Sequence, residues 1–152
     1  MNETMIQMMK LGQKGYSCSQ ILISLALELR GETNPGLVRA LAGLAYGCGG
    51  SGSCGALTGA CCILGLYAGK GDDHEEQSEK LLVMMQELSG WFQERIESQH
   101  GGITCEAVTG ENGPEASRQT CGTIVAETYD KTIEILLSNG FEPSGEMVDH
   151  IE

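Results

Sequence analysis

Residues 47–69 read GCGGSGSCGALTGACCILGLYAG, and this glycine-rich, charge-free stretch contributes most to the prediction of the fold. Its first six residues predict a flexible loop, because glycine reaches backbone angles that other residues avoid. The remainder predicts a helix from Ser53 to about Tyr67. Two pairs of glycines four residues apart would let another helix approach this one closely: Gly55 with Gly59, and Gly65 with Gly69.

Helical patterns continue on both sides of this stretch, and no segment shows the sustained alternation of a strand. Helices are predicted over residues 3–13, 17–30, 35–46, 73–99 and 121–138, with a helical turn over 104–110 and a tight turn over 111–114. The longest helix has a single apolar stripe: Leu81, Met84, Met85, Leu88, Phe92 and Ile96. In the last helix, Val125, Tyr129, Ile133, Leu136 and Leu137 are expected to face inward. We therefore predict an all-α fold, a single-domain bundle of about five to six helices over residues 1–141, followed by a mobile tail over residues 142–152.

Four of the seven cysteines share a local signature, in which Ser or Thr precedes the cysteine and an apolar residue follows three positions later. These are Cys18, Cys54, Cys105 and Cys121. A hydroxyl residue before an apolar helix is a typical N-cap, so each cysteine is expected in a first helical turn. Unpaired N–H groups and the positive end of the helix favour a thiolate there, the form that binds metal or reacts in redox chemistry. Four such residues predict one shared metal or iron–sulfur centre.

The spacing between these four cysteines is 35, 50 and 15 residues, and the chain has no C-x-x-C pair. This pattern excludes zinc ribbons, thioredoxin-type redox sites and c-type haem attachment, all of which need closely spaced ligands. The tertiary fold must therefore gather the four residues into one site within a helical bundle.

The motif CGALTG at residues 54–59, which follows the glycine-rich loop, looks like the CGAxxG motif of the C_GCAxxG_C_C family of redox-active proteins. Cys18, Cys105 and Cys121 resemble the first, third and fourth cysteines of that family, and the resemblance covers roughly residues 5–138. It implies an iron–sulfur cluster bound by the four cysteines. The chain is also similar to the non-haem part of split-Soret cytochrome c, which favours [2Fe–2S] over [4Fe–4S]. Since the chain has no haem-attachment motif, haem-dependent activity is not implied.

The other three cysteines, Cys48, Cys61 and Cys62, depart from the four-cysteine pattern. Cys61 follows Cys54 by seven residues, which is two helical turns or about 10 Å along a helix axis. We therefore expect Cys61 and Cys62 to pack in the core. Cys48 lies in the flexible loop and is a candidate for an additional ligand, an exchangeable ligand or a disulfide partner.

The net charge of −12 argues against nucleic acid or an anionic membrane surface as a partner. The uncharged stretch around residues 40–69 contains nine glycines and is too weakly apolar for a membrane span. We see no secretory signal. A cytoplasmic location is predicted, where cysteines serve metal binding or catalysis more often than structural disulfides.

These observations predict an electron carrier or redox accessory protein more than a stand-alone enzyme. Four thiolates fill the protein ligand positions of a centre, and no general base can be placed beside them. The expected partners are a redox protein with a basic patch and a second copy of this chain, which would form a homodimer. Two alternatives stay open: a metal-free thiol–disulfide protein, and a helical interaction module stabilised by zinc, which also accepts four thiolates.

Overall fold

The computed structural model describes residues 3–50, 52–110 and 118–144 of the chain. Within these residues every regular element is helical, apart from one isolated β-bridge between Ser53 and Thr104. The elements in chain order are α1 (Glu3–Gln13), α2 (Cys18–Leu29), α3 (Pro35–Leu41), the 3₁₀ turn η1 (Ala42–Leu44), α4 (Ala45–Cys48), α5 (Gly55–Ala68), α6 (Lys80–His100), α7 (Cys105–Thr109) and α9 (Arg118–Ser138). Six of these helices have seven residues or more, so the predicted all-α bundle of five to six helices is confirmed. No helix in the described ranges is both long and apolar enough to cross a membrane.

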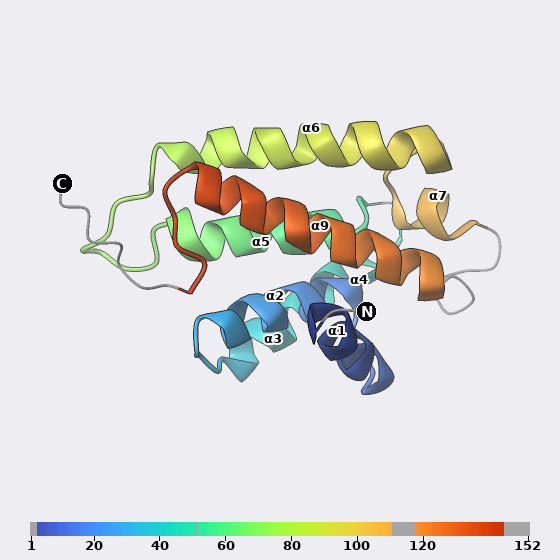
Figure 1. Cartoon of the computed structure of the whole chain (residues 1–152), viewed down its shortest axis with the longest axis horizontal. Helices are drawn as coiled ribbons and strands as arrows, with labels where there is room; N and C mark the ends of the chain where they lie inside the picture. Colours follow the sequence, from blue (N-terminus) through green and yellow to red (C-terminus); the bar gives the residue numbers. More distant parts are fainter. Residues whose placement is uncertain (1–2, 51, 111–117, 145–152) are drawn as a thin grey trace.

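The bundle is built around α5, which packs against α2, α6 and α9. Its central position follows from its sequence, because α5 has no charged side chain and most of its residues are buried. Figure 1 shows that α2, α5 and α9 begin at the same end of the bundle, whereas α6 runs in the opposite direction. The starts of three helices that are far apart in the sequence therefore meet at one end of the molecule.

The close contact between α2 and α5 depends on glycine. A Cβ atom placed on Gly59 would lie only 2.8 Å from the Cα atom of Ser19, so a larger residue would clash with the backbone of α2. Ser19 is buried, and its hydroxyl donates a hydrogen bond to the carbonyl oxygen of Leu41 at 2.8 Å. The close helix contact predicted at Gly55 and Gly59 is confirmed, whereas a Cβ on Gly65 would meet nothing within 4 Å.

The apolar stripe predicted for the longest helix is confirmed in α6, where five of its residues are buried: Leu81, Met84, Leu88, Phe92 and Ile96. The predicted start near residue 73 is wrong, because α6 begins at Lys80. In the preceding loop, Asp72 accepts a hydrogen bond from the N–H of His74 at 2.8 Å, and Glu75 accepts one from the N–H of Gly71 at 2.5 Å. Such local bonds from side chains to the backbone compete with helix formation.

The segment after α3 also differs from its prediction as a continuous helix to residue 46. The backbone of Tyr46, Gly47 and Cys48 is left-handed, with φ angles of 58°, 67° and 57°. This conformation is unfavourable for residues that carry a Cβ atom. A Cβ on Gly47 would lie 2.4 Å from the carbonyl oxygen of Gly52, so the tight turn requires glycine at this position.

α9 begins at Arg118, three residues before its predicted start. Its buried face includes Ile124, Val125, Tyr129, Ile135 and Leu136. Leu137, which was expected to face inward, is 55% exposed, because Ile135 and Leu136 fill the core at this end of the helix.

The first residues of the predicted tail lie against the bundle, since the hydroxyl of Tyr67 in α5 donates a hydrogen bond to the carbonyl oxygen of Pro143. The rest of that tail, residues 145–152, lies outside the described residues, as does the turn predicted over 111–114.

Candidate functional site

Each of the four cysteines with the shared signature lies at the start of a helix. Cys18 and Cys105 are the first residues of α2 and α7, Cys54 is the N-cap of α5, and Cys121 lies in the first turn of α9. Figure 1 shows α7 beside the first turns of α9, at the end of the bundle where α2 and α5 also begin. The fold therefore carries all four cysteines to one end of the bundle.

Hydrogen bonds hold the start of α2 in place. The N–H of Ser17 donates to the side-chain oxygen of Gln20 at 3.1 Å, and the side-chain nitrogen of Gln20 donates to the carbonyl oxygen of Val38 at 3.1 Å. Because Val38 belongs to α3, these bonds join the start of α2 to the next helix in the chain. The position of Cys18 is therefore set by both helices.

The starts of α5 and α7 are joined by backbone pairing that the sequence did not predict. Ser53 forms a β-bridge with Thr104, and the N–H of Cys54 donates to the carbonyl oxygen of Ile103 at 2.7 Å. Thr104 acts as the predicted N-cap, since its hydroxyl oxygen accepts from the N–H of Ala107 at 3.0 Å. Ser53 does not cap α5, because the bridge holds it outside the helix and Cys54 takes the capping position.

The four thiols interact with one another. A side-chain hydrogen bond joins Cys18 and Cys121. Each pair among Cys18, Cys54, Cys105 and Cys121 interacts through charge: the negative charge of one thiolate raises the pKa of the other. The hydrogen bond from Cys18 acts in the opposite direction and lowers the pKa of Cys121. The structure thus brings together four residues that the sequence spreads over more than a hundred positions.

The two thiols of the hydrogen-bonded pair, Cys18 and Cys121, have pKa values shifted in opposite directions. Cys121 accepts the hydrogen bond from Cys18, which lowers the pKa of Cys121 from 9.0 to about 7 although its burial acts in the opposite direction. The pKa of Cys18 is raised far above its ordinary value, first by this hydrogen bond and then by burial and by the charges of the other three thiols. Cys121 is therefore the first of the pair to become a thiolate.

The pKa values of the other two thiols, Cys54 and Cys105, are higher than that of an ordinary cysteine thiol. Burial raises the pKa of Cys54 to about 11, although hydrogen bonds from the N–H groups of Ala56 and Leu57 lower it. Burial and the charge of Cys121 raise the pKa of Cys105, and a hydrogen bond from the side chain of Thr109 acts against this increase. Thr109 was not identified from the sequence, although its position four residues after Cys105 places it on the same helical face.

The expectation that a helix start favours the thiolate at all four positions is therefore wrong for three of them. Backbone N–H groups lower the pKa of Cys54 alone among these three, and burial outweighs them there. The hydrogen bond with Cys121 raises the pKa of Cys18 most, and burial raises that of Cys105 most. The repulsion between neighbouring thiolates is removed by a bound cation, which is why clustered cysteines are common metal ligands.

Four thiols are the right donor set for an all-cysteine centre, and their helix-start N–H groups suit sulfur ligands. In the ranges that the structure describes, however, no three His, Cys, Asp or Glu side chains are placed so that they could hold a metal ion. The assignment of Cys18, Cys54, Cys105 and Cys121 as ligands therefore stays a prediction.

The three remaining cysteines are placed differently. Cys61 and Cys62 are partly buried on α5, where the pKa of Cys61 is raised by burial and by Cys62 and lowered by a hydrogen bond with Ser89 of α6. Cys48 is exposed in its left-handed turn. All seven cysteines are free thiols in this structure.

The fold and the thiol cluster define a class of protein: a helical bundle that brings together cysteines from four helix starts. The chain belongs to the family described as "Putative redox-active protein (C_GCAxxG_C_C)", whose model matches residues 16–135 and so includes all four cysteines. This match confirms the resemblance that rests on the CGALTG motif. No curated protein and no solved structure matches the chain significantly.

In the metal-free protein, Cys121 should react with iodoacetamide faster than the other three clustered cysteines at pH 7. A thiol with a pKa of about 7 is roughly half ionised there, and the thiolate is the nucleophile. Replacing Cys18 with Ala removes the hydrogen-bond donor, so the pKa of Cys121 should rise toward 9.0 and its reaction at pH 7 should slow. Mass spectrometry of alkylation between pH 5 and 10 measures this effect. An unchanged pH profile of Cys121 in the Cys18→Ala variant would contradict the assignment, and Cys62→Ala serves as the control.

Proposed function

We propose that this protein holds an iron–sulfur cluster on Cys18, Cys54, Cys105 and Cys121 and acts in electron transfer, with [2Fe–2S] favoured over [4Fe–4S]. The observation that carries the proposal is the gathering of four mutually interacting thiols at one end of the bundle. A cluster bound there supplies reversible uptake of a single electron. We also propose that the protein is an electron carrier or redox accessory protein and not a stand-alone enzyme.

The surroundings of the four thiols support this proposal. Four thiolates in one partly buried place repel one another, and a cationic centre would offset that repulsion. The backbone N–H groups of Ala56 and Leu57 lower the pKa of the Cys54 thiol, and the side chain of Thr109 lowers that of Cys105. Hydrogen bonds to ligand sulfurs stabilise negative charge on them and raise the reduction potential of a cluster.

Anaerobic purification followed by iron, sulfide and zinc counts tests the proposal directly. We expect iron and sulfide in equal amounts, a visible absorption spectrum, and a reversible one-electron change in a redox titration that follows the cluster content. A colourless, redox-silent protein with one zinc per chain would reject electron transfer in favour of the zinc-stabilised interaction module.

A second candidate function is thiol–disulfide exchange, which the hydrogen bond between Cys18 and Cys121 favours. In the first step of this reaction, the Cys121 thiolate attacks a disulfide oxidant and one oxidant sulfur leaves as a thiolate. In the second step, the Cys18 thiol loses its proton, attacks the sulfur of Cys121 and displaces the other oxidant sulfur as a thiolate. The two cysteines lose two electrons and form one S–S bond. The oxidant gains these two electrons and is reduced to two thiols. A two-electron titration that persists without metal, with loss of two free thiols, would favour this function over the cluster.

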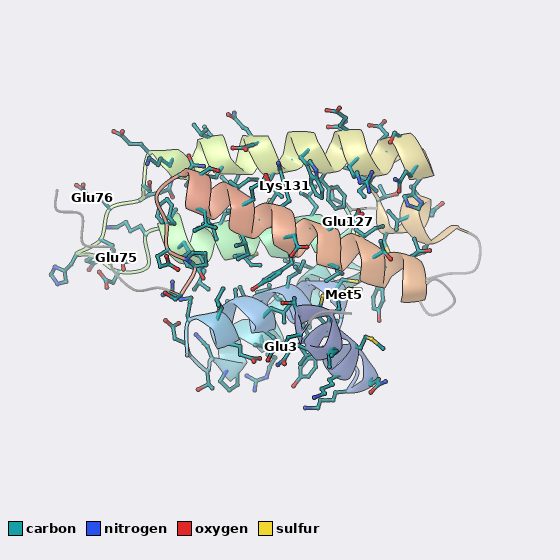
Figure 2. All side chains as sticks on the ribbon, in the orientation of Figure 1. Glu3, Met5, Glu75, Glu76, Glu127 and Lys131 are labelled. Atoms are coloured by element: carbon teal, nitrogen blue, oxygen red, sulfur yellow. The ribbon has the colours of Figure 1, made fainter. Side chains whose placement is uncertain are left out.

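The distribution of charge suggests how a redox partner would bind. Residues 1–44 carry four basic and three acidic side chains, whereas residues 45–152 carry five basic and eighteen acidic ones. Figure 2 shows Glu75 and Glu76 at the end of the bundle opposite the helix starts, and Glu127 on α9. We propose a partner protein with a basic patch that binds in a weak, salt-sensitive encounter, and neither nucleic acid nor a membrane surface.

We also propose a homodimer formed through the α1 side of the molecule. Ile6, Met9 and Tyr16 are 43%, 51% and 39% exposed there, and the near-neutral charge of residues 1–44 avoids the repulsion that two acidic faces would have. Light scattering at micromolar concentration should give twice the mass of one chain, and the mass of one chain would reject the dimer.

A cytoplasmic location is proposed as well, because a reducing compartment keeps all seven cysteines as free thiols.

A further inference from the structure

A groove with a volume of about 590 Å³ lies between α2, the start of α3 and the turn after α1. Binding pockets in proteins commonly have volumes of about 300–1,000 Å³. Most of the surface that lines the groove is apolar, and its apolar side chains are Leu11, Tyr16, Leu27, Pro35 and Val38. Figure 1 shows α1, α2 and α3 together on the side of the bundle away from α6. The groove therefore opens on the α1 side of the molecule.

Exposed apolar side chains gather beside this groove. Of the eight large hydrophobic side chains that are exposed in the described part of the chain, four belong to α1, to the turn after it or to the end of α2. These four are Ile6, Met9, Tyr16 and Leu29, and their exposed fractions are between 39% and 51%. Ile6 and Met9 are three residues apart, so they share one face of α1. Clusters of exposed apolar side chains are typical of interaction surfaces.

The helix α1 has one face that the rest of the chain leaves uncovered. Met8 is the only buried residue of this eleven-residue helix. Helices shorter than about 12–15 residues are marginal in water and depend on packing for their stability. Lys10 and Lys14 are exposed as well, and neither forms an ion pair with a described residue. The uncovered face of α1 is therefore both apolar and basic.

The rim of the groove has the opposite charge. Two exposed carboxylates, Glu28 and Glu32, belong to its lining, and we call them the rim carboxylates. Glu32 is paired with Arg30 at 3.0 Å, whereas Glu28 accepts a hydrogen bond from the neutral amide of Gln7 and so keeps its full charge. Arg39 is the only basic side chain in the lining, which leaves the lining with two negative charges and one positive charge. A basic helix face therefore complements this groove.

We propose that the occupant of this groove is α1 of a second copy of the chain, with Ile6 and Met9 against the apolar lining and Lys10 beside Glu28 of the other copy. The contact rests on the homodimer proposed above and does not depend on an iron–sulfur cluster. Binding of an amphipathic helix in an apolar groove is a common mode of recognition. In a two-fold dimer this contact occurs twice, because each copy supplies one helix and one groove. The charges at the rim fix the orientation of the helix.

Cross-linking of the unchanged protein with a carbodiimide tests the contact. This reagent joins a lysine amine directly to a neighbouring carboxylate, and an equilibrated mixture of unlabelled and heavy-nitrogen chains identifies the links between copies. We expect mixed-isotope peptides that join Lys10 or Lys14 of one copy to the rim carboxylates of the other. A dimer without these links would overturn the proposed contact and leave the homodimer standing, whereas a monomer would overturn both.

Substitutions on the two sides of the contact provide a second test. Met9→Asp places a charge on the uncovered face of α1, and Ser24→Arg fills the groove with a charged side chain; both positions are partly or fully exposed, so the fold should persist. Light scattering should give the mass of one chain for each variant, at a concentration where the unchanged protein gives twice that mass, and circular dichroism should show the same helix content.

Val83→Arg is the matched control, since Val83 is 55% exposed on α6, which lies across the bundle from the groove. This variant should form a dimer like the unchanged protein. A dimer that survives both Met9→Asp and Ser24→Arg would overturn the proposal, and its loss in Val83→Arg would place the interface on α6 instead.

Discussion

Serine in place of Cys18, Cys54, Cys105 or Cys121 should remove most of the bound metal and lower the stability of the fold. The four residues lie at the starts of four different helices, so a shared centre would tie together parts of the chain that are distant in sequence, and metal binding would contribute folding free energy. Loss of a direct ligand should weaken metal binding by more than the roughly 10- to 100-fold that loss of a supporting residue costs. Metal analysis and urea denaturation of each purified variant measure the two effects.

The matched controls for these variants are Cys61→Ser and Cys62→Ser, which change partly buried cysteines on α5 outside the thiol cluster. Both should retain the metal. Cys48→Ser tests whether the exposed cysteine in the left-handed turn is an additional or exchangeable ligand. Equal loss of metal in all seven single variants would contradict the four-cysteine assignment.

Alanine in place of Gly59 should disturb both the contact between α2 and α5 and the thiol cluster. The new Cβ would lie 2.8 Å from the Cα atom of Ser19 and 3.2 Å from its carbonyl oxygen, so α2 and α5 would have to move apart. Overpacking of this kind costs about 1–3 kcal/mol. Because Cys18 immediately precedes Ser19, the same movement should separate Cys18 from Cys54 and reduce the metal content.

Gly65→Ala is the control on the same helix, since a Cβ on Gly65 would meet nothing within 4 Å. Alanine is favoured over glycine inside a helix, so this variant should be as stable as the unchanged protein or more stable by up to about 1 kcal/mol. Urea denaturation and iron content compare the two variants. If Gly59→Ala were as stable and as rich in iron as Gly65→Ala, the close contact would not control the site.

Features that depend on local spacing were predictable from the sequence. The stripe from Leu81 to Ile96 became the buried face of α6, and the contact at Gly55 and Gly59 was recognised from glycines four residues apart. Boundaries were predicted less well, because competing hydrogen bonds decide them. The side chains of Asp72 and Glu75 accept hydrogen bonds from nearby backbone N–H groups, and α6 begins only at Lys80.

The sequence identified Cys18, Cys54, Cys105 and Cys121 as helix-start residues and as the cysteines of one redox-active family, because both inferences need only neighbouring residues and their order. It could not show that the first and last of them are hydrogen-bonded, or that Cys121 has a pKa of about 7 while the pKa of Cys54 rises to about 11. These properties depend on burial and on charges brought close by packing. Only the tertiary structure, in which α2, α5, α7 and α9 begin at one end of the bundle, decides them.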